Sequence, residues 1–165
     1  MHAAEEFLHP LGALPIKMDI TIRKMQRDDG NAVIDMMRKF YTSPAVITNG
    51  SEKIFAANVE NILRGSPYVE GFVFTVEDKI VGYGITAHSY ATEFGGECIW
   101  IEDLYIEAEY RGRGIGTKFI QYVKEIYPDK IFRLKTEHDN DAALKIYKRH
   151  GFKELPYLEM VCNGD

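Results

Sequence analysis

The chain has 165 residues, which is enough for one domain of ordinary size and too few for two. Hydrophobic residues make up 45% and charged residues 27%, with 9 Phe and 10 Tyr, and this composition excludes a disordered chain. The formal net charge of −5, without a basic tail, argues against a nucleic-acid partner, because such binding depends largely on neutralising phosphates. A soluble enzyme or ligand-binding module remains, in which a local basic cluster can still bind a small anion.

Residues 1–17 are predicted to form an N-terminal extension, because they show neither the basic start nor the long apolar run of a signal peptide. A single domain is predicted over 18–162. It begins with a short strand at 20–23, where β-branched residues alternate. Apolar residues at helical spacing then predict one helix over 33–40 and a second over 51–63.

The rest of the chain alternates strands with helices. The predicted strands are 72–76, 80–86, 98–106, 131–136 and a final region at 151–161 that Pro156 interrupts. The predicted helices are 112–127 and 141–149. Gly82 and Gly84 weaken the second of these strands and indicate a close approach, either by a ligand or by another chain. This order of elements indicates a mixed sheet with helices packed on its faces.

Cys98 and Cys162 are the only cysteines, and neither has a Cys or His neighbour at the spacing of metal ligands. We therefore expect reduced thiols in a cytoplasmic protein rather than a zinc site or a disulfide framework. No apolar run approaches the roughly 20 residues of a membrane-spanning helix. Neither a metal nor a membrane is expected as a partner.

A glycine-rich segment at 110–118, Tyr-Arg-Gly-Arg-Gly-Ile-Gly-Thr-Lys, follows the longest predicted strand and opens a helix. Helix N-termini carry unpaired N–H groups and the positive end of the helix dipole. Glycines let a ligand approach this backbone closely, and Arg111 and Arg113 add positive charge. The segment is a candidate pyrophosphate site, and an ordinary glycine turn with solvated arginines is the weaker interpretation.

The spacing within this segment separates it from two common phosphate-binding motifs. A Walker A loop requires Lys directly after its last glycine, whereas Thr117 stands between Gly116 and Lys118. A dinucleotide-binding fingerprint is Gly-x-Gly-x-x-Gly after the first strand of a parallel unit. Here the pattern is Gly-x-Gly-x-Gly, late in the chain. Neither motif matches.

Residues 111–116 follow the pattern Arg-x-x-Gly-x-Gly, which resembles the Gln/Arg-x-x-Gly-x-Gly/Ala motif of the GCN5-related N-acetyltransferases. A second segment, 140–152, resembles that family's Asn-x-x-Ala-x-x-x-Tyr-x-x-x-Gly-Phe block. The segment 101–106, Ile-Glu-Asp-Leu-Tyr-Ile, is similar to the spermidine/spermine-type small-amine acetyltransferases in particular. The resemblance covers 19–161, which is nearly the whole chain.

This resemblance implies an α/β (α+β) fold with a mixed, mostly antiparallel sheet of about six to seven strands, flanked by about four helices, in which two central strands splay apart. It implies acetyl-CoA as cofactor, with the pyrophosphate on the glycine loop and the pantetheine arm along the fourth strand. The implied cofactor-binding residues are Leu104, Tyr105, Ile106, Arg111, Gly112, Arg113, Gly114, Ile115, Gly116, Thr117, Asn140, Ala143 and Tyr147. Many members dimerise, so a homodimer is expected.

Acetyl transfer to an amine requires one proton to leave the substrate ammonium and one to reach the departing thiolate. By resemblance, Glu102 is the general base, directly or through a water, and Tyr147 is the general acid. A backbone N–H near Leu104 would stabilise the oxyanion. Alternatively, Glu102 is a surface or ion-paired carboxylate, since Asp103 beside it is expected on the opposite face, and Tyr147 is a core side chain.

Two groups of residues are candidates for the acceptor site, namely the acids Glu93, Glu97, Glu102 and Asp103 and the aromatics Tyr41, Tyr90 and Trp100. Clustered acids attract a cation, and aromatic rings can cover an ammonium group. Glu102, Asp103, Trp100 and Tyr41 are the predicted substrate-binding residues. We expect a small polyamine-like or related primary amine, and solvated loop charges are an equally good interpretation of the acids.

Other functions fit the same motifs. A peptide or protein N-acetyltransferase would use the same glycine loop with a different acceptor. A non-catalytic acyl-CoA-binding sensor would keep the loop and lose the chemistry, and the intact Tyr147 argues against it. A binder of a different phosphate ligand is a weaker alternative.

Overall fold

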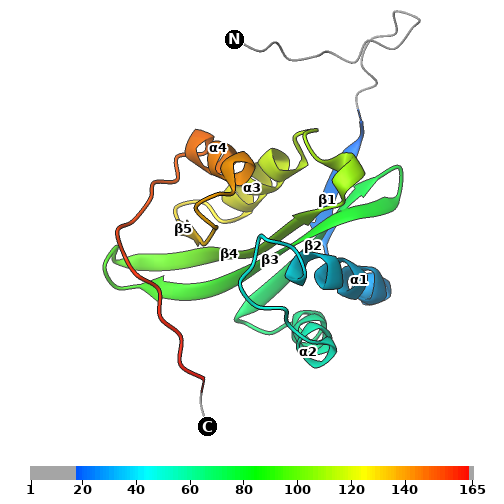
Figure 1. Ribbon diagram of the computed structural model, residues 1–165, viewed down its shortest axis with the longest axis horizontal. Helices are drawn as coiled ribbons and strands as arrows, with labels where there is room; N and C mark the ends of the chain where they lie inside the picture. Colours follow the sequence, from blue (N-terminus) through cyan, green and yellow to red (C-terminus); the bar gives the residue numbers. More distant parts are fainter. Residues whose placement is uncertain (1–17, 164–165) are drawn as a thin grey trace, which may run out of the picture.

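A five-stranded sheet forms the middle layer of the protein (Figure 1). The computed structural model describes residues 18–163, and the predicted N-terminal extension at 1–17 lies outside this range. Across the sheet the strands are β1 (Ile20–Lys24), β2 (Val69–Val76), β3 (Lys79–Ala91), β4 (Gly96–Ile106) and β5 (Ile131–Leu134). Neighbours among β1 to β4 are antiparallel, whereas β5 runs parallel to β4.

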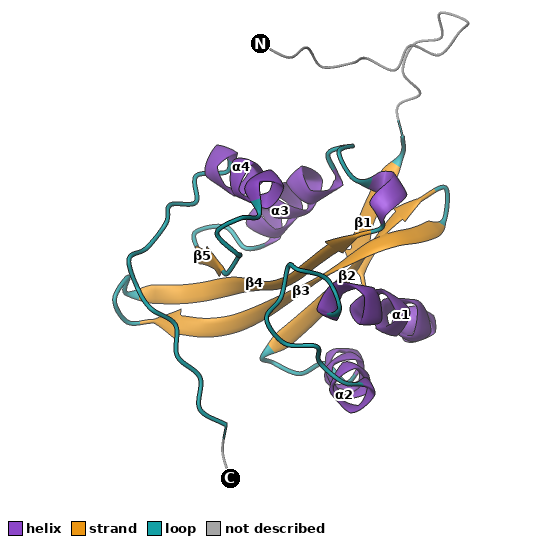
Figure 2. Cartoon of the chain, in the orientation of Figure 1, coloured by secondary structure: helices purple, strands orange, loops and turns teal. Residues whose placement is uncertain are grey.

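Two pairs of helices cover the two faces of this sheet (Figures 1 and 2). One face carries α1 (Gly30–Tyr41) and α2 (Glu52–Leu63), and the other carries α3 (Ile115–Ile126) and α4 (Asp141–Arg149). Short 3-10 turns lie at Arg27–Asp29 and Ala108–Tyr110. Within 18–163, none of the helices has the length and apolar character needed to cross a membrane.

Alternation of side chains along the strands divides the core into two parts. On β2, Val73 belongs to the cluster under α1 and α2, whereas Phe72 and Phe74 pack against Phe119 of α3. The helical stripe predicted over 33–40 is confirmed, because its apolar side chains are buried on one side of α1.

Gly82 and Gly84 in β3 make room for other parts of the same chain. A Cβ on Gly84 would lie 2.4 Å from a ring atom of Phe119 in α3. A Cβ on Gly82 would lie 2.5 Å from the backbone oxygen of Tyr105 in β4. The close approach predicted from these glycines is present, but it is made by α3 and β4 rather than by a ligand or another chain.

The predicted sheet of six to seven strands is wrong for the described residues, which form five. No strand occurs in 151–163, although one was expected over 151–161. Pro156 has no N–H to donate to a ladder, and the neighbouring edge strand β5 has only 4 residues. Leu158 and Val161 are 86% and 88% exposed, so no buried apolar face holds this segment in register as a strand.

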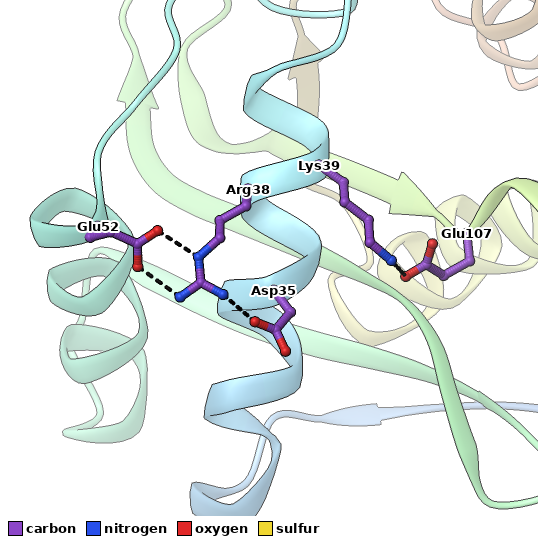
Figure 3. Close-up of polar contacts among 5 residues, drawn as sticks. All are labelled: Asp35, Arg38, Lys39, Glu52 and Glu107. Carbon is purple, nitrogen blue, oxygen red and sulfur yellow. Dashed lines mark hydrogen bonds and ion pairs between the residues drawn. The ribbon is translucent and has the colours of Figure 1, made fainter.

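Ion pairs restrain α1 against its neighbours (Figure 3). The Arg38 guanidinium donates to both carboxylate oxygens of Glu52 in α2, at 2.5 and 2.8 Å, and also pairs with Asp35. Lys39 Nζ donates to Glu107 Oε1 at 2.7 Å, just after β4 ends. Exposed pairs of this kind add little stability, and the position of α1 depends mainly on its buried side chains, Val33, Met36, Met37 and Phe40.

Replacing Gly84 by Ala is expected to lower the free energy of unfolding by about 1–3 kcal/mol, because the new methyl group overlaps the fully buried ring of Phe119. Urea denaturation measures this loss. The matched control is Gly96→Ala in β4, where the nearest atom is the flexible end of the Ile131 side chain, 3.2 Å away. Equal losses in the two variants would contradict the steric explanation.

Candidate functional site

An extra residue in β4 determines where the candidate site lies. β3 and β4 pair Ile85 with Asp103 and Thr86 with Ile101, so Glu102 has no partner across this ladder. Such a β-bulge bends the strand and re-aims the side chains beside it. Glu102 and Asp103 consequently line one cavity, and the expectation that they face opposite sides of the sheet is not met.

This cavity has a volume of about 450 Å³ and lies between the sheet and the helices α1 and α2. Tyr41 enters it from the end of α1, and Asn58 and Asn61 enter it from α2. The remaining lining residues are Ile62, Ser66, Tyr68, Val69 and Ile85, together with Glu102 and Asp103. Three of the four predicted substrate-binding residues, Tyr41, Glu102 and Asp103, are therefore brought together.

Two tyrosine hydroxyls hold the carboxylate of Asp103, whose residue is only 4% exposed. Tyr83 donates to Oδ2 at 3.0 Å, and Tyr41 donates to Oδ1 at 3.1 Å. Burial raises the pKa of Asp103 to about 6; the two hydroxyl donors act in the opposite direction, and the nearby charge of Glu102 raises it. Asp103 is therefore mostly ionised at neutral pH despite its burial.

No cation neutralises Asp103 within residues 18–163, since it takes part in none of the ion pairs of that range. The charged neighbour that acts on it is Glu102, which is also acidic. A buried charge without a partner is unfavourable. A positively charged ligand in the cavity would remove this cost.

The other predicted acids do not reach the cavity. Glu97 forms an ion pair with Lys130 next to β5. Glu93, in the turn between β3 and β4, accepts a hydrogen bond from the Tyr157 hydroxyl at 2.6 Å. The acidic cluster expected from the sequence thus reduces to Glu102 and Asp103.

Trp100 lies outside the cavity lining. The Arg133 guanidinium carbon is 4.3 Å from the centroid of its ring, and Lys135 Nζ is 5.7 Å from it. Because cationic side chains already occupy this ring, it is poorly suited to cover a substrate ammonium. Tyr90 is 63% exposed and also does not line the cavity.

The glycine loop presents free backbone N–H groups at the start of α3. Gly112 and Gly114 have φ values of 72° and 82°, and a Cβ on either would meet nothing within 4 Å. Gly114 is the N-cap of α3, and no side chain within 18–163 caps the N–H groups that follow it at Ile115, Gly116 and Thr117. This arrangement is typical of an anion-binding helix terminus.

Arg111 points toward its own chain. Its Nε donates to the carbonyl oxygen of Ile106 at 2.8 Å, and its guanidinium carbon lies 5.6 Å from the centroid of the Tyr105 ring. Tyr105 packs in the core cluster under α1, whereas Leu104 and Ile106 pack in the cluster on the α3 side. The side chain of Tyr105 therefore lies on the sheet face away from α3, where only Arg111 of the glycine loop reaches it.

Beyond Ile101, β4 has no partner strand on its β5 side. The parallel ladder ends at the pair Ile101–Leu134, and β4 continues to Ile106. Within the described part of the chain, the backbone of 102–106 on this edge pairs with no strand. Such N–H and C=O groups require another partner.

The second motif lies on α4, beside the glycine loop. A Cβ on Gly116 would lie 3.8 Å from the Ile146 side chain, so α4 and the start of α3 are in contact. Asn140 accepts a hydrogen bond from the Ala143 N–H at 3.3 Å and thereby caps α4. This capping gives Asn140 a structural role at the predicted cofactor site.

Tyr147 is a half-buried residue of α4. Its ring packs edge-on against Phe152, with the centroids 5.9 Å apart. Burial raises the pKa of the Tyr147 hydroxyl above its ordinary value. The hydroxyl therefore stays protonated at neutral pH, as a general acid must.

Comparison with known proteins identifies the family. Residues 32–152 match the model of the acetyltransferase (GNAT) family. The chain belongs to this family. A possible acetyltransferase from Clostridium difficile 630 shares the fold, with a TM-score of 0.73 and 24% identity over 88% of this chain and 98% of that one.

Two curated relatives are similar over part of this GNAT chain. It is 41% identical over 83 residues to the thialysine N-epsilon-acetyltransferase of Bos taurus, covering 48% of each chain. It is 32% identical over 59 residues to the spermine/spermidine N(1)-acetyltransferase of Bacillus subtilis (strain 168), covering 33% of this chain and 39% of the relative. The chain thus matches about half or less of the length of these relatives.

Sequence patterns do not reveal Tyr83, Asn58 or Asn61 as residues of this site. In sequence, Tyr83 has the pattern of a core aromatic residue between two glycines. Its hydroxyl reaches Asp103 because of the register between β3 and β4, which the sequence does not show. The two asparagines lie three positions apart on α2, which is the one available signal that they share a face.

Removing the charge of Asp103 is expected to change how stability depends on pH. Its pKa is about 6 in the folded protein against an ordinary 3.8, so its stabilising contribution is present below about pH 4 and is lost as pH rises through about 6. Asp103→Asn should therefore gain on the order of 2–3 kcal/mol relative to the wild type between about pH 4 and pH 7. Urea denaturation across this range measures the difference. Asp28→Asn is the control, because Asp28 is exposed in the first 3-10 turn and forms no ion pair within 18–163, and a pH-independent difference for Asp103→Asn would contradict the prediction.

Proposed function

We propose that the protein is an acetyl-CoA-dependent N-acetyltransferase that acts on a primary amine of a small, cationic, polyamine-like or related acceptor. The observation that carries this proposal is the buried carboxylate of Asp103, which lines a cavity beside Glu102 and has no cationic partner in the described chain. A protonated amine supplies the missing charge. Membership of the GNAT family supplies the donor class.

The residues present fit acetyl-CoA. When bound, it supplies an activated acetyl group as a thioester. The free N–H groups from Gly112 to Thr117 suit its pyrophosphate, because they converge on the positive end of the α3 dipole. On the edge away from β3, the backbone of 102–105 pairs with no strand of the described chain and suits the amide groups of its pantetheine arm, whereas the Ile106 carbonyl is already bonded to Arg111. Arg113, which is exposed next to this loop, adds positive charge.

In the proposed mechanism, Asp103 holds the acceptor ammonium and Glu102 removes one of its protons, directly or through a water. The freed lone pair attacks the thioester carbonyl, and a backbone N–H near Leu104 donates to the oxygen that gains charge. Tyr147 gives its proton to the departing sulfur. The nitrogen loses a second proton to solvent as the amide forms, Glu102 releases its proton and Tyr147 regains one from solvent, so the products are the acetylated amine, the free thiol and one proton.

A peptide or protein acceptor is the first alternative, and the cavity volume of about 450 Å³ favours a small molecule over it. A non-catalytic acyl-CoA sensor is the second, and the retention of Tyr147 on α4 disfavours it. The homodimer expected from the family resemblance stays a prediction.

Acetyl-CoA at about 100 times its Kd should stabilise the protein by about 2.7 kcal/mol and raise its Tm by on the order of 5–10 °C. Gly114→Glu should abolish this shift, because it places a negative side chain in the anion site at a left-handed backbone position. Gly95→Glu is the matched control, since Gly95 also has a positive φ and open surroundings but lies in the β3–β4 turn. No shift in the wild type would refute the proposed donor.

Glu102→Gln and Tyr147→Phe should each lower kcat by about 10²–10⁴, while the Tm shift with acetyl-CoA is kept, because each removes one proton-transfer group and no part of the anion site. Release of free thiol measures the rate. Glu97→Gln changes the same residue type outside the cavity, and Tyr127→Phe removes a hydroxyl at the C-terminal end of α3, away from the glycine loop; both are expected to turn over normally. Normal turnover in Glu102→Gln or Tyr147→Phe would remove that residue from the mechanism.

A further inference from the structure

The cavity that holds Glu102 and Asp103 is lined by two chemically different groups of residues, a charged side from β4 and a neutral end from α2 and the segment after it. Both carboxylates come from the β4 bulge. The polar groups contributed by α2 and the segment after it are all uncharged, namely Asn58, Asn61, Ser66 and Tyr68. Among the residues described, no Lys, Arg or His lines the cavity.

The neutral end offers both donors and acceptors of hydrogen bonds. Asn58 makes no hydrogen bond through its side chain within 18–163, so its amide has free donor and acceptor groups. Asn61 Nδ2 donates to the carbonyl oxygen of Ala57 at 2.9 Å, which leaves its Oδ1 as an acceptor. Ser66 Oγ accepts from the Tyr68 N–H at 3.2 Å and keeps its own hydroxyl proton to donate.

A second ammonium at this end would find no counter-charge. Glu60, the acid nearest in sequence on α2, is exposed, pairs with Arg64 and does not line the cavity. Asn61 and Tyr68 are exposed, so a second ammonium there keeps much of its hydration but gains no direct ion pair, whereas a hydroxyl or amide gains hydrogen bonds. The neutral end therefore favours an uncharged tail over the second ammonium of a diamine or longer polyamine.

An acceptor with a carboxylate tail would bind less favourably than one with a second ammonium. No cationic side chain lines the cavity in the described part of the chain, and the only charges there, on Glu102 and Asp103, repel an anion. An amino acid acceptor would bring such a carboxylate into the site. A hydroxyl or amide has neither problem, because Asn58, Asn61 and Ser66 can satisfy it completely.

We propose that the acceptor carries one primary amine, held between Glu102 and Asp103, and an uncharged hydrogen-bonding tail that reaches Asn58 and Asn61. The acceptor class is thus an amino alcohol or amino amide rather than a polyamine or an amino acid. This inference rests on the proposed acetyltransferase function and narrows its acceptor to the related primary amines, leaving out the polyamine-like ones.

Three amines of equal chain length test the inference, namely aminopentanol, diaminopentane and aminopentanoate. Each presents the same terminal amine and differs only in the tail. Free-thiol release with saturating acetyl-CoA gives kcat/KM for each. We expect aminopentanol to exceed both others at least about tenfold, and a diaminopentane value equal to or above that of aminopentanol would overturn the inference.

The Asn58→Asp variant provides a second test of the inference, because it adds a carboxylate at the neutral end with almost no change in shape. We expect the ratio of kcat/KM for diaminopentane over aminopentanol to rise at least about tenfold in this variant. Asn31→Asp is the matched control, since Asn31 is exposed in the first turn of α1 and the same charge there should leave the ratio unchanged. An unchanged ratio in Asn58→Asp would also overturn the inference.

Failure of the function and failure of the tail preference give different results. If acetyl-CoA raises the Tm but none of the three amines releases thiol, both the small-amine activity and this inference are overturned. If all three amines turn over with similar kcat/KM, the acetyltransferase function stands and the tail preference alone is overturned.

Discussion

The β-bulge at Glu102 is the constraint on which the candidate site depends. Without the extra residue, regular alternation along β4 would send Glu102 and Asp103 to opposite faces of the sheet. With it, both carboxylates line one cavity under α1 and α2. The ladder with β5 ends at Ile101, the residue before the bulge, so the same local bend coincides with the start of the unpaired edge. The bulge thus marks two sites at once. Its carboxylates line the acceptor cavity on one face of the sheet, and the strand edge that is available to a second ligand begins at the same residue.

The buried charge created by this bulge explains several features around it. Asp103 is tolerated because Tyr83 and Tyr41 each donate to one of its oxygens, which favours the ionised form against the effect of burial. Tyr41 reaches it only because α1 ends at the correct place, and the contacts of Arg38 and Lys39 restrain α1 against α2 and the end of β4. These surface ion pairs add little stability, and the position of α1 depends mainly on its buried side chains.

Much of the fold follows from local patterns, whereas the site depends on pairing between distant residues. The helical stripe over 33–40 and the strand-to-helix junction at 110–118 are visible in sequence because they depend on periodicity and on glycines. The role of Tyr83 is not visible, because it depends on the register between β3 and β4. The strand expected over 151–161 is absent for a related reason. Its apolar residues have strand propensity, but no strand of the described chain pairs with this segment. The sequence also suggested Glu93, Glu97 and Trp100 as acceptor residues. Each of them instead contacts a side chain that is distant in sequence, and the sequence alone does not show these contacts.

The glycine loop and the acceptor cavity are not simply a basic site for the donor and an acidic site for the acceptor. Arg111, the first basic residue of the glycine loop, donates to the Ile106 carbonyl, so its side chain first orders the turn between β4 and α3. The anion site then depends chiefly on N–H groups that Gly112 and Gly114 leave uncovered. On the acceptor side, only two of the predicted acids are in place, and the wall opposite them is neutral. Recognition of both ligands would therefore come from a small number of oriented groups rather than from overall charge, which is consistent with a chain whose net charge is only −5.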